Sequence, residues 1–360
     1  MTSGPTVVVD SAKAQEFAGR MLARFNDAAL SLMVSVGHRT GLFDSMAQMP
    51  PATSEQIAAA AKLKERYVRE WLGAMVLGRI VTYEPHTKTY RLPPEHAASL
   101  TRAAGANNVA MFCQYIALAG HVEDRIVECF RKGGGVPYSA FPKFQELQAE
   151  ESAMTHDAIL VDVILPMAPG LVDRLKSGLD VADVGCGSGH ILNVMAKAFP
   201  RSRFVGFDLS KQGIAAGRDE ARRLRLKNVR FAVADVAALK LKKACDLALA
   251  IDTVHDQAKP RRVLRGIATA LRPGGVFLME DIAASSTLEE NMDHPLGPAL
   301  FSMSTLHCLT VSLAYKGEGL GTMWGEQKAR ELLSEAGFAE VATHSIPGDP
   351  LHRFYVATRK

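Results

Sequence analysis

The chain has 360 residues, of which 48% are hydrophobic, and this is enough apolar material for more than one packed core. Its 42 basic and 38 acidic residues leave a net charge of +4, which is small for this length and does not favour nucleic acid or an anionic membrane as a partner. No stretch is long and apolar enough to cross a bilayer, and residues 1–10 lack the pattern of a signal peptide. We therefore expect a cytoplasmic protein without membrane contacts.

The cysteines are odd in number and scattered, with no C-x-x-C pair. They are Cys113, Cys129, Cys186, Cys245 and Cys308. This spacing predicts reduced thiols in place of a disulfide framework or a zinc site. No other metal site is predicted.

The first hundred residues carry helical signals. Apolar residues recur at helical spacing over 17–36, which predicts a long first helix that ends near Gly41. Thr53 and Gln56 form a capping-box signature at the start of a second helix, predicted over 55–61.

A further helix is predicted over 65–77, where apolar residues again share one face. Two short strand-like stretches, 79–83 and 89–92, then flank a turn and predict a hairpin. Helices followed by a hairpin indicate a winged-helix module, which we place at residues 1–104.

A helical connector is predicted at 105–170. Its apolar and amphipathic segments, 108–116, 121–130 and 150–168, are interrupted by a glycine-rich turn at 132–138.

A glycine turn follows the connector. Strand-like residues 179–184 run into three glycines at alternate positions, and 191–199 resume helical spacing. The glycines are Gly185, Gly187 and Gly189. They let the backbone pass close to a ligand, while the free N–H groups at the helix start favour an anionic group. Asp208 ends the next strand-like stretch, where a carboxylate can accept hydrogen bonds from both hydroxyls of a ribose.

The glycine spacing is G-x-G-x-G, whereas a dinucleotide-binding turn has G-x-G-x-x-G. The segments 183–189 and 205–208 resemble motifs of the class I S-adenosylmethionine-dependent methyltransferases. Further matches follow in the same order, at 231–235, 246–252 and 271–278. The resemblance implies an α/β fold at 171–360, a doubly wound, Rossmann-like sheet of seven strands whose last strand runs antiparallel.

The resemblance also implies how S-adenosylmethionine is bound. The glycines would approach its methionine part, Asp208 the ribose and Asp235 the adenine, with Leu209 and Val236 on either side of the ring. The full set of expected cofactor-binding residues is Asp183, Gly185, Cys186, Gly187, Gly189, Asp208, Leu209, Asp235, Val236 and Asp252.

Many small-molecule O-methyltransferases have a similar winged-helix-like domain that pairs two subunits. Bacterial methyltransferases with this module, some of them labelled transcriptional regulators, resemble the whole chain. The resemblance implies a homodimer formed through residues 1–104. DNA remains a possible partner, but Arg66 and Arg69 are accompanied by Glu65 and Glu70, a mixed surface that does not favour phosphate contacts.

His255 is the expected general base. It and Asp256 resemble the catalytic His and following Asp of plant phenolic O-methyltransferases, in which an acid after the fifth strand orients the imidazole. Asp281 falls at the position of that acid, with Glu280 adjacent. We therefore expect methyl transfer to a hydroxyl group of a small molecule. The alternatives are a pocket-lining or structural His255, S- or N-methylation without a base, and a cofactor-binding transcriptional regulator.

The acceptor pocket is expected under the connector helices, which roof this site in the resembling family, and under a lid at 281–324. Its candidate residues are Gln114, Tyr115, His121, Tyr138, His307 and Trp324.

Overall fold

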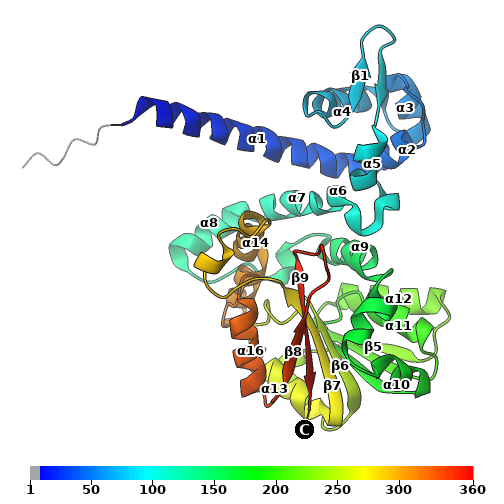
Figure 1. Cartoon of the computed structure of the whole chain (residues 1–360), viewed down its shortest axis with the longest axis vertical. Helices are drawn as coiled ribbons and strands as arrows, with labels where there is room; N and C mark the ends of the chain where they lie inside the picture. Colours follow the sequence, from blue (N-terminus) through cyan, green and yellow to red (C-terminus); the bar gives the residue numbers. More distant parts are fainter. Residues whose placement is uncertain (1–8, 360) are drawn as a thin grey trace, which may run out of the picture. The chain divides into compact units, whose positions relative to one another are not determined.

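The structure is a computed structural model that describes residues 9–359, shown in Figure 1. The chain divides into two compact units, with the division between Ala117 and Leu118. Each unit is described by itself. The domain boundaries expected at 104 and 170 stay predictions.

The first unit has the helices and hairpin that the sequence predicts. Its elements are α1 (Ser11–Thr40), α2 (Leu42–Ala47), α3 (Ser54–Ala61), α4 (Glu65–Leu77), β1 (Thr82–Glu84), β2 (Thr89–Arg91), α5 (Pro94–Leu100), a 3₁₀ turn (Arg102–Asn107) and α6 (Val109–Phe112). Gly41 ends α1 in the left-handed conformation. The capping box of Thr53 and Gln56 is present at the start of α3, and β1 pairs antiparallel with β2.

A small core holds this unit together. The rings of Phe43 and Trp71 meet edge to face at 5.3 Å, and the Trp71 indole N–H donates to the carbonyl of Met33 at 2.8 Å. Leu72 and Met75 of α4 are completely buried against them. By contrast, every residue of α1 from 11 to 29 is exposed, including Phe17, Met21 and Phe25 of the predicted apolar stripe.

The second unit contains a seven-stranded sheet. Its elements, after α7 (Gln114–Gly120), which crosses the division, are α8 (Glu123–Lys132), α9 (Phe144–His156), α10 (Leu171–Ser177), β3 (Asp180–Val184), α11 (His190–Ala198), β4 (Arg203–Asp208), α12 (Lys211–Arg223), β5 (Val229–Val233), β6 (Cys245–Ile251), α13 (Pro260–Ala270), β7 (Leu271–Ile282), α14 (Gly297–Met303), α15 (Leu309–Ala314), α16 (Gly325–Glu335), β8 (Val341–His344) and β9 (His352–Thr358), with short 3₁₀ and π-helical turns between them.

The strand order is β5-β4-β3-β6-β7-β9-β8. The first five strands in this order are parallel, and β9 runs antiparallel to both β7 and β8. This confirms the doubly wound α/β fold and its antiparallel last strand.

Helices cover both faces of the sheet (Figure 1). Val181 and Leu247 pack with α10, α11 and α12 on one face, while the alternate residues Ala182 and Ala248 pack with α13 and α16 on the other. Burial on both faces explains why most residues of these central strands are apolar. Parallel strands bring their carboxyl ends to one edge of the sheet, so the segments that follow β3, β4, β6 and β7 meet there.

One segment differs from the sequence prediction. The helix expected over 150–168 ends at His156 and is followed by a π-helical turn (Leu160–Ile164). Tertiary contacts accompany this break: His156 bonds to Glu280, and Asp157 accepts from His190 at 2.7 Å. The expected lid over 281–324 contains the helices α14 and α15.

Among the described residues, no helix combines the length and apolar character needed to span a membrane.

Candidate active site

The glycine turn sits at the carboxyl end of β3, and two of its glycines are required by packing. Gly185 and Gly189 have φ of +81° and +67°, which L residues rarely adopt. A Cβ at Gly185 would lie 2.0 Å from Oγ1 of Thr253, and one at Gly189 would lie 2.2 Å from the ring of Phe231. A Cβ at Gly187 would instead have only Oε1 of Gln145 as a neighbour, at 3.3 Å. Gly187 is therefore the glycine that the fold itself needs least.

Asp208 ties this turn to the end of β4. Its Oδ2 accepts from the backbone N–H of Gly187 at 2.9 Å, and its Oδ1 accepts from that of Ser210 at 2.7 Å. Burial raises the pKa of Asp208, although these backbone donors oppose the rise. Each carboxylate oxygen retains a second lone pair, so Asp208 can still accept from a diol. The next helix, α11, starts after Gly189, which has no side chain to cap its N–H groups.

Asp183, the last but one residue of β3, is a buried carboxyl group. Burial, together with the nearby charge of Asp208, raises its pKa to about 8. Its Oδ1 has no hydrogen-bond partner in the described part of the chain. A buried, unpaired acid of this kind is suited to a cationic group that arrives with a ligand.

The residues expected around the adenine differ in exposure. Asp235 is exposed, and its Oδ1 accepts from the N–H of Ala237 at 2.9 Å. Leu209 is 57% exposed and free to cover a ring, whereas Val236 is 5% exposed and belongs to the core beneath α13. The Cys186 thiol packs against the core, and burial raises its pKa well above its usual range. Because the thiol is buried, only the backbone of Cys186 is left to approach a ligand at the glycine turn.

His255 follows β6 and is held by Asp281 at the end of β7. Nδ1 of His255 lies 2.9 Å from Oδ1 of Asp281. The same oxygen accepts from the indole N–H of Trp324 at 2.8 Å, and Asp281 is completely buried. Burial opposes the charged imidazole, but the attraction of Asp281 outweighs it and raises the pKa of His255 well above its usual range. The sequence prediction that Asp281 orients His255 thus has the geometry it requires.

Asp256 forms a hydrogen bond with Tyr138 and not with its neighbour His255, which pairs with Asp281. Its Oδ2 accepts a hydrogen bond from the hydroxyl of Tyr138. Burial raises the pKa of Asp256 to about 6, although the His255 charge and the bond from Tyr138 oppose the rise. Tyr138, a candidate pocket residue, is thereby placed beside the expected base.

His307 belongs to an aromatic cluster that includes Tyr138, the partner of Asp256. Its ring stacks on Phe144 at 4.1 Å and meets Phe141 at 4.5 Å and Tyr138 at 5.4 Å. Burial, assisted by the charge of His255, lowers the pKa of His307 to about 3, so the ring is neutral. Trp324 is 5% exposed and packs in the core, so its visible role is to hold Asp281.

The remaining pocket candidates are Gln114, Tyr115 and His121. Gln114 and Tyr115 belong to the first unit and stay predictions. His121 is exposed in the turn before α8.

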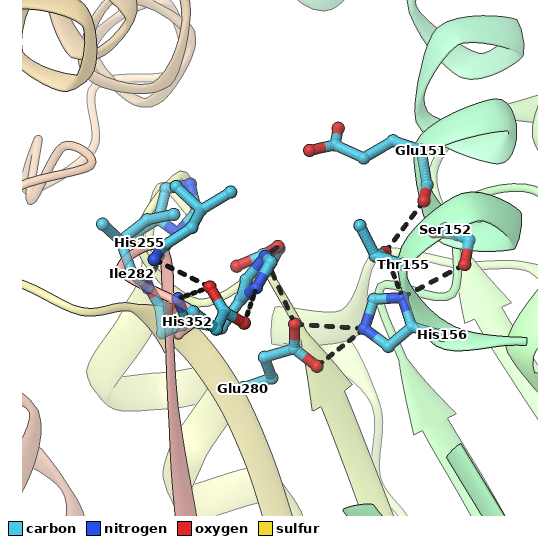
Figure 2. A network of polar contacts seen from close by, with 12 residues as sticks. Glu151, Ser152, Thr155, His156, His255, Glu280, Ile282 and His352 are labelled. Carbon is cyan, nitrogen blue, oxygen red and sulfur yellow. Dashed lines mark hydrogen bonds and ion pairs between the residues drawn. The ribbon is translucent and has the colours of Figure 1, made fainter. Parts of the chain in front are cut away.

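A second polar group lies next to His255 and was missed by the sequence analysis. Figure 2 shows Glu280 between His156 of α9 and His352 of β9. His156 Nε2 lies 2.8 Å from Oε2 of Glu280, and His352 Nδ1 lies 2.8 Å from Oδ2 of Asp349. Glu280 was visible beside Asp281, but no spacing in the sequence connects residues 156, 280 and 352. Only the pairing of β7 with β9 brings the last two together.

Two family models match separate parts of the chain. Residues 28–102 match a Rv2258c-like winged HTH domain, and residues 175–337 match a methyltransferase domain. Residues 175–337 are a methyltransferase domain. It follows the winged helix-turn-helix domain, as the sequence resemblance implied.

The methyltransferase domain also resembles curated proteins. Malonyl-[acyl-carrier protein] O-methyltransferase of Acetivibrio thermocellus is 32% identical over 111 residues, which are 30% of this chain and 38% of that protein. The chain spans 38% to 55% of the lengths of the first curated relatives that it matches.

Two solved structures share the architecture along nearly the whole chain. Human N-acetylserotonin methyltransferase, solved with SAM, has a TM-score of 0.68 at 18% identity, over 99% of this chain and 99% of its own. An O-methyltransferase family protein from Burkholderia thailandensis has a TM-score of 0.68 at 16% identity, over 98% of this chain and 99% of its own. These similarities establish that the winged-helix and methyltransferase domains occur together in one fold.

Proposed function

We propose that the chain transfers a methyl group from S-adenosylmethionine to a hydroxyl group of a small molecule, with His255 as the general base. The observation that carries this proposal is the buried pair of His255 and Asp281 at the edge of the sheet where the glycine turn lies. Alternatives without a base leave this pair without a role, and they are not favoured.

The cofactor's proposed position follows from the hydrogen-bonding and charged groups around the glycine turn. Asp208 offers carboxylate lone pairs to a ribose diol, and the uncapped start of α11 offers N–H groups to a carboxylate. Asp183 is placed to meet an ammonium group, since its buried acid lacks a partner. Together these groups match the charged amino-acid tail and the sugar of S-adenosylmethionine. When bound, the cofactor supplies an activated methyl group on a sulfonium.

The residues of the chain have to position the acceptor and remove its proton. Asp281 accepts from Nδ1–H of His255, so Nε2 is the nitrogen that would take the hydroxyl proton once the ring is neutral. Although burial opposes the charged ring, Asp281 and the neighbouring Cys308 both raise the pKa of His255, so this step is favoured at higher pH. The bound cofactor would supply the methyl group to the acceptor oxygen, with its sulfur as the leaving group that keeps the electron pair. The proton ends on His255, and the positive charge of the sulfonium is neutralised. Tyr138 and the neutral His307 form the aromatic surroundings in which the acceptor is excluded from water.

The chain is proposed to act as a homodimer through α1. The side chains of Phe17 and Phe25 are 52% and 70% exposed on a helix whose residues 11–29 are all exposed. Apolar exposure of this extent is typical of a surface that is covered in an assembly. Regulation by DNA binding is not favoured, because Arg66 and Arg69 of α4 form ion pairs with Glu70 and Glu65. A cytoplasmic location is proposed because all five cysteines are free thiols.

The test is a methyl-transfer assay on the full chain with labelled S-adenosylmethionine and a panel of phenols, alcohols and thiols. We expect labelled ether products from hydroxyl acceptors. Calorimetry in which neither S-adenosylmethionine nor its demethylated product binds would refute the proposal. Transfer to thiols alone would refute the assignment of His255 as a base while keeping the enzyme class.

A further inference from the structure

Three side chains converge at the carboxyl edge of the sheet without hydrogen bonds between them. His352 starts β9, Glu280 lies near the end of β7 and Asp252 follows β6, so the strand order brings them together. Nε2 of His352 lies 3.7 Å from Oδ2 of Asp252 and 3.5 Å from Oε1 of Glu280. Both separations exceed those of N–H···O hydrogen bonds, which are about 2.7–3.2 Å.

The separations of 3.5 and 3.7 Å are within about 0.1 Å of those between atoms that bind one metal ion. Two ligand atoms at about 2.0–2.2 Å from a metal, at the tetrahedral angle, lie roughly 3.3–3.6 Å apart. The three ligand atoms all lie within 4.8 Å of one another. We propose that Asp252, Glu280 and His352 bind a divalent transition-metal cation. This site goes beyond the proposed methyl transfer, with which it shares Asp252, an expected cofactor-binding residue.

Two of the three ligands are oriented by further partners, as first-coordination-sphere ligands usually are. Nδ1 of His352 is engaged by Oδ2 of Asp349 at 2.8 Å, which turns Nε2 toward the other two ligands. Glu280 is held by Nε2 of His156 at 2.8 Å from Oε2 and 3.1 Å from Oε1 (Figure 2). The hydrogen bonds between Asp349 and His352 and between His156 and Glu280 resemble the second-sphere contacts that orient the ligands of a metal site.

Carboxylate oxygens without partners lie beside these ligands. Asp252 Oδ1 and Asp281 Oδ2 are buried and have no hydrogen-bond partner in the described part of the chain. Asp281 is completely buried, and with Asp252 and His255 it forms an adjoining group whose ligand atoms also lie within 4.8 Å of one another. Unpaired buried carboxylate oxygens are costly, and a cation next to Asp252 would offset that cost.

The donor types narrow the choice of cation. One imidazole and two carboxylates favour Mn²⁺, Fe²⁺ or Zn²⁺ over Ca²⁺, which takes oxygen ligands alone, and the absence of a thiolate ligand in this set disfavours Cu⁺. Mn²⁺ is the suitable probe because it binds carboxylate and imidazole, avoids the free thiols and has an electron paramagnetic resonance signal.

The experiment is a Mn²⁺ titration of the full-length protein after treatment with a chelator, followed by electron paramagnetic resonance. We expect one bound Mn²⁺ per chain, with a nitrogen coupling from the imidazole in the electron spin echo. His352→Gln should abolish that coupling and Asp252→Asn should weaken binding at least tenfold. Asp349→Asn should weaken it by ~10- to 100-fold, as loss of an orienting partner does elsewhere. Asp293→Asn, at an exposed acid, is the matched control and should change nothing.

Circular dichroism of each variant separates loss of metal binding from loss of folding, and Glu280→Gln replaces any variant that does not fold. Wild-type protein that binds no Mn²⁺, or binding that survives in both His352→Gln and Asp252→Asn, would overturn the proposal. In that case His352 serves only as an imidazolium between two carboxylates. Because binding is measured directly, this outcome leaves the proposed methyl transfer untouched.

Discussion

Oδ1 of Asp281 lies 2.9 Å from Nδ1 of His255 inside a completely buried environment. The carboxylate can only accept, so Nδ1 carries the proton and Nε2 is left with a lone pair when the ring is neutral. The pair therefore fixes both the tautomer and the direction of the imidazole. A general base requires this arrangement with the ring neutral, and the raised pKa of His255 shifts the loss of its second proton to higher pH.

Replacing His255 should separate acceptors that need a base from those that do not. We expect His255→Ala to lower kcat/KM for a hydroxyl acceptor by ~10²- to 10⁴-fold, the usual contribution of a general base. Affinity for S-adenosylmethionine, measured by calorimetry, should stay unchanged. His86→Gln, in the exposed turn between β1 and β2, is a control histidine that should leave the rate unchanged. A loss below tenfold would mean that His255 is not the base.

Trp324 is expected to act through Asp281. In Trp324→Phe the ring volume is largely kept, but the 2.8 Å hydrogen bond to Asp281 is lost. We expect kcat for a hydroxyl acceptor to fall by about tenfold, equivalent to ~1.5 kcal/mol for one hydrogen bond to a charged group. Transfer to a thiolate should be unaffected. Phe338→Leu, another core change, should lower the Tm without this selectivity; equal losses on both acceptors would indicate a purely structural role for Trp324.

The two glycines Gly187 and Gly189 should respond differently to an added methyl group. Both have positive φ, so alanine costs about 1–2 kcal/mol at either position. Only at Gly189 would the new Cβ also lie 2.2 Å from the Phe231 ring. We expect Gly189→Ala to have the lower Tm, and Gly187→Ala to keep more stability but bind the cofactor more weakly. Thermal unfolding and calorimetry test this, and equal Tm values for the two variants would contradict it.

The fold could be predicted from the sequence because its determinants are local. The capping box of Thr53 and Gln56, the apolar stretch before Gly185 and the acid at Asp208 each act within a few residues, and each is found where it was predicted. The orienting role of Asp281 needed a family resemblance, because it acts across strands.

The rest of the site depends on contacts between distant residues. His156 meets Glu280 because α9 ends against the sheet, and Tyr138 reaches Asp256 from a segment more than a hundred residues away. No periodicity records such contacts. The alternation of apolar residues likewise could not show how deeply Val236 and Trp324 are buried in the core, since both are ordinary apolar positions in the sequence.

Exposed apolar residues on α1 predict the oligomeric state. We expect wild-type protein to be a dimer by light scattering, and Phe17→Ser combined with Phe25→Ser to shift it toward monomer, since these side chains are 52% and 70% exposed. Asn26→Ser is the matched control, because its position is on the opposite side of the helix from Phe17. A monomeric wild type, or a double variant that stays dimeric, would exclude α1 as the interface.

Asp183 should make both stability and cofactor binding depend on pH. Its pKa in the folded state, about 8, is raised from the ordinary value of 3.8, so the folded protein keeps a proton that the unfolded chain releases. Stability therefore falls as pH rises from about 4 to about 8 and then levels off. The Asp183→Asn variant cannot ionise at this position, so its stability should not fall for this reason as the pH rises. We expect its Tm to equal that of the wild type near pH 4 and to exceed it increasingly toward pH 8.

The same substitution should weaken binding of the demethylated cofactor, because its ammonium group then has no anion at position 183. In the wild type the bound ammonium favours the ionised carboxyl, so affinity should rise with pH up to about 8, by at most about tenfold per pH unit. Calorimetry across this range measures both effects. A Tm difference that does not change with pH would show that Asp183 is ionised in the folded protein, and an affinity independent of pH would show that the ammonium binds elsewhere.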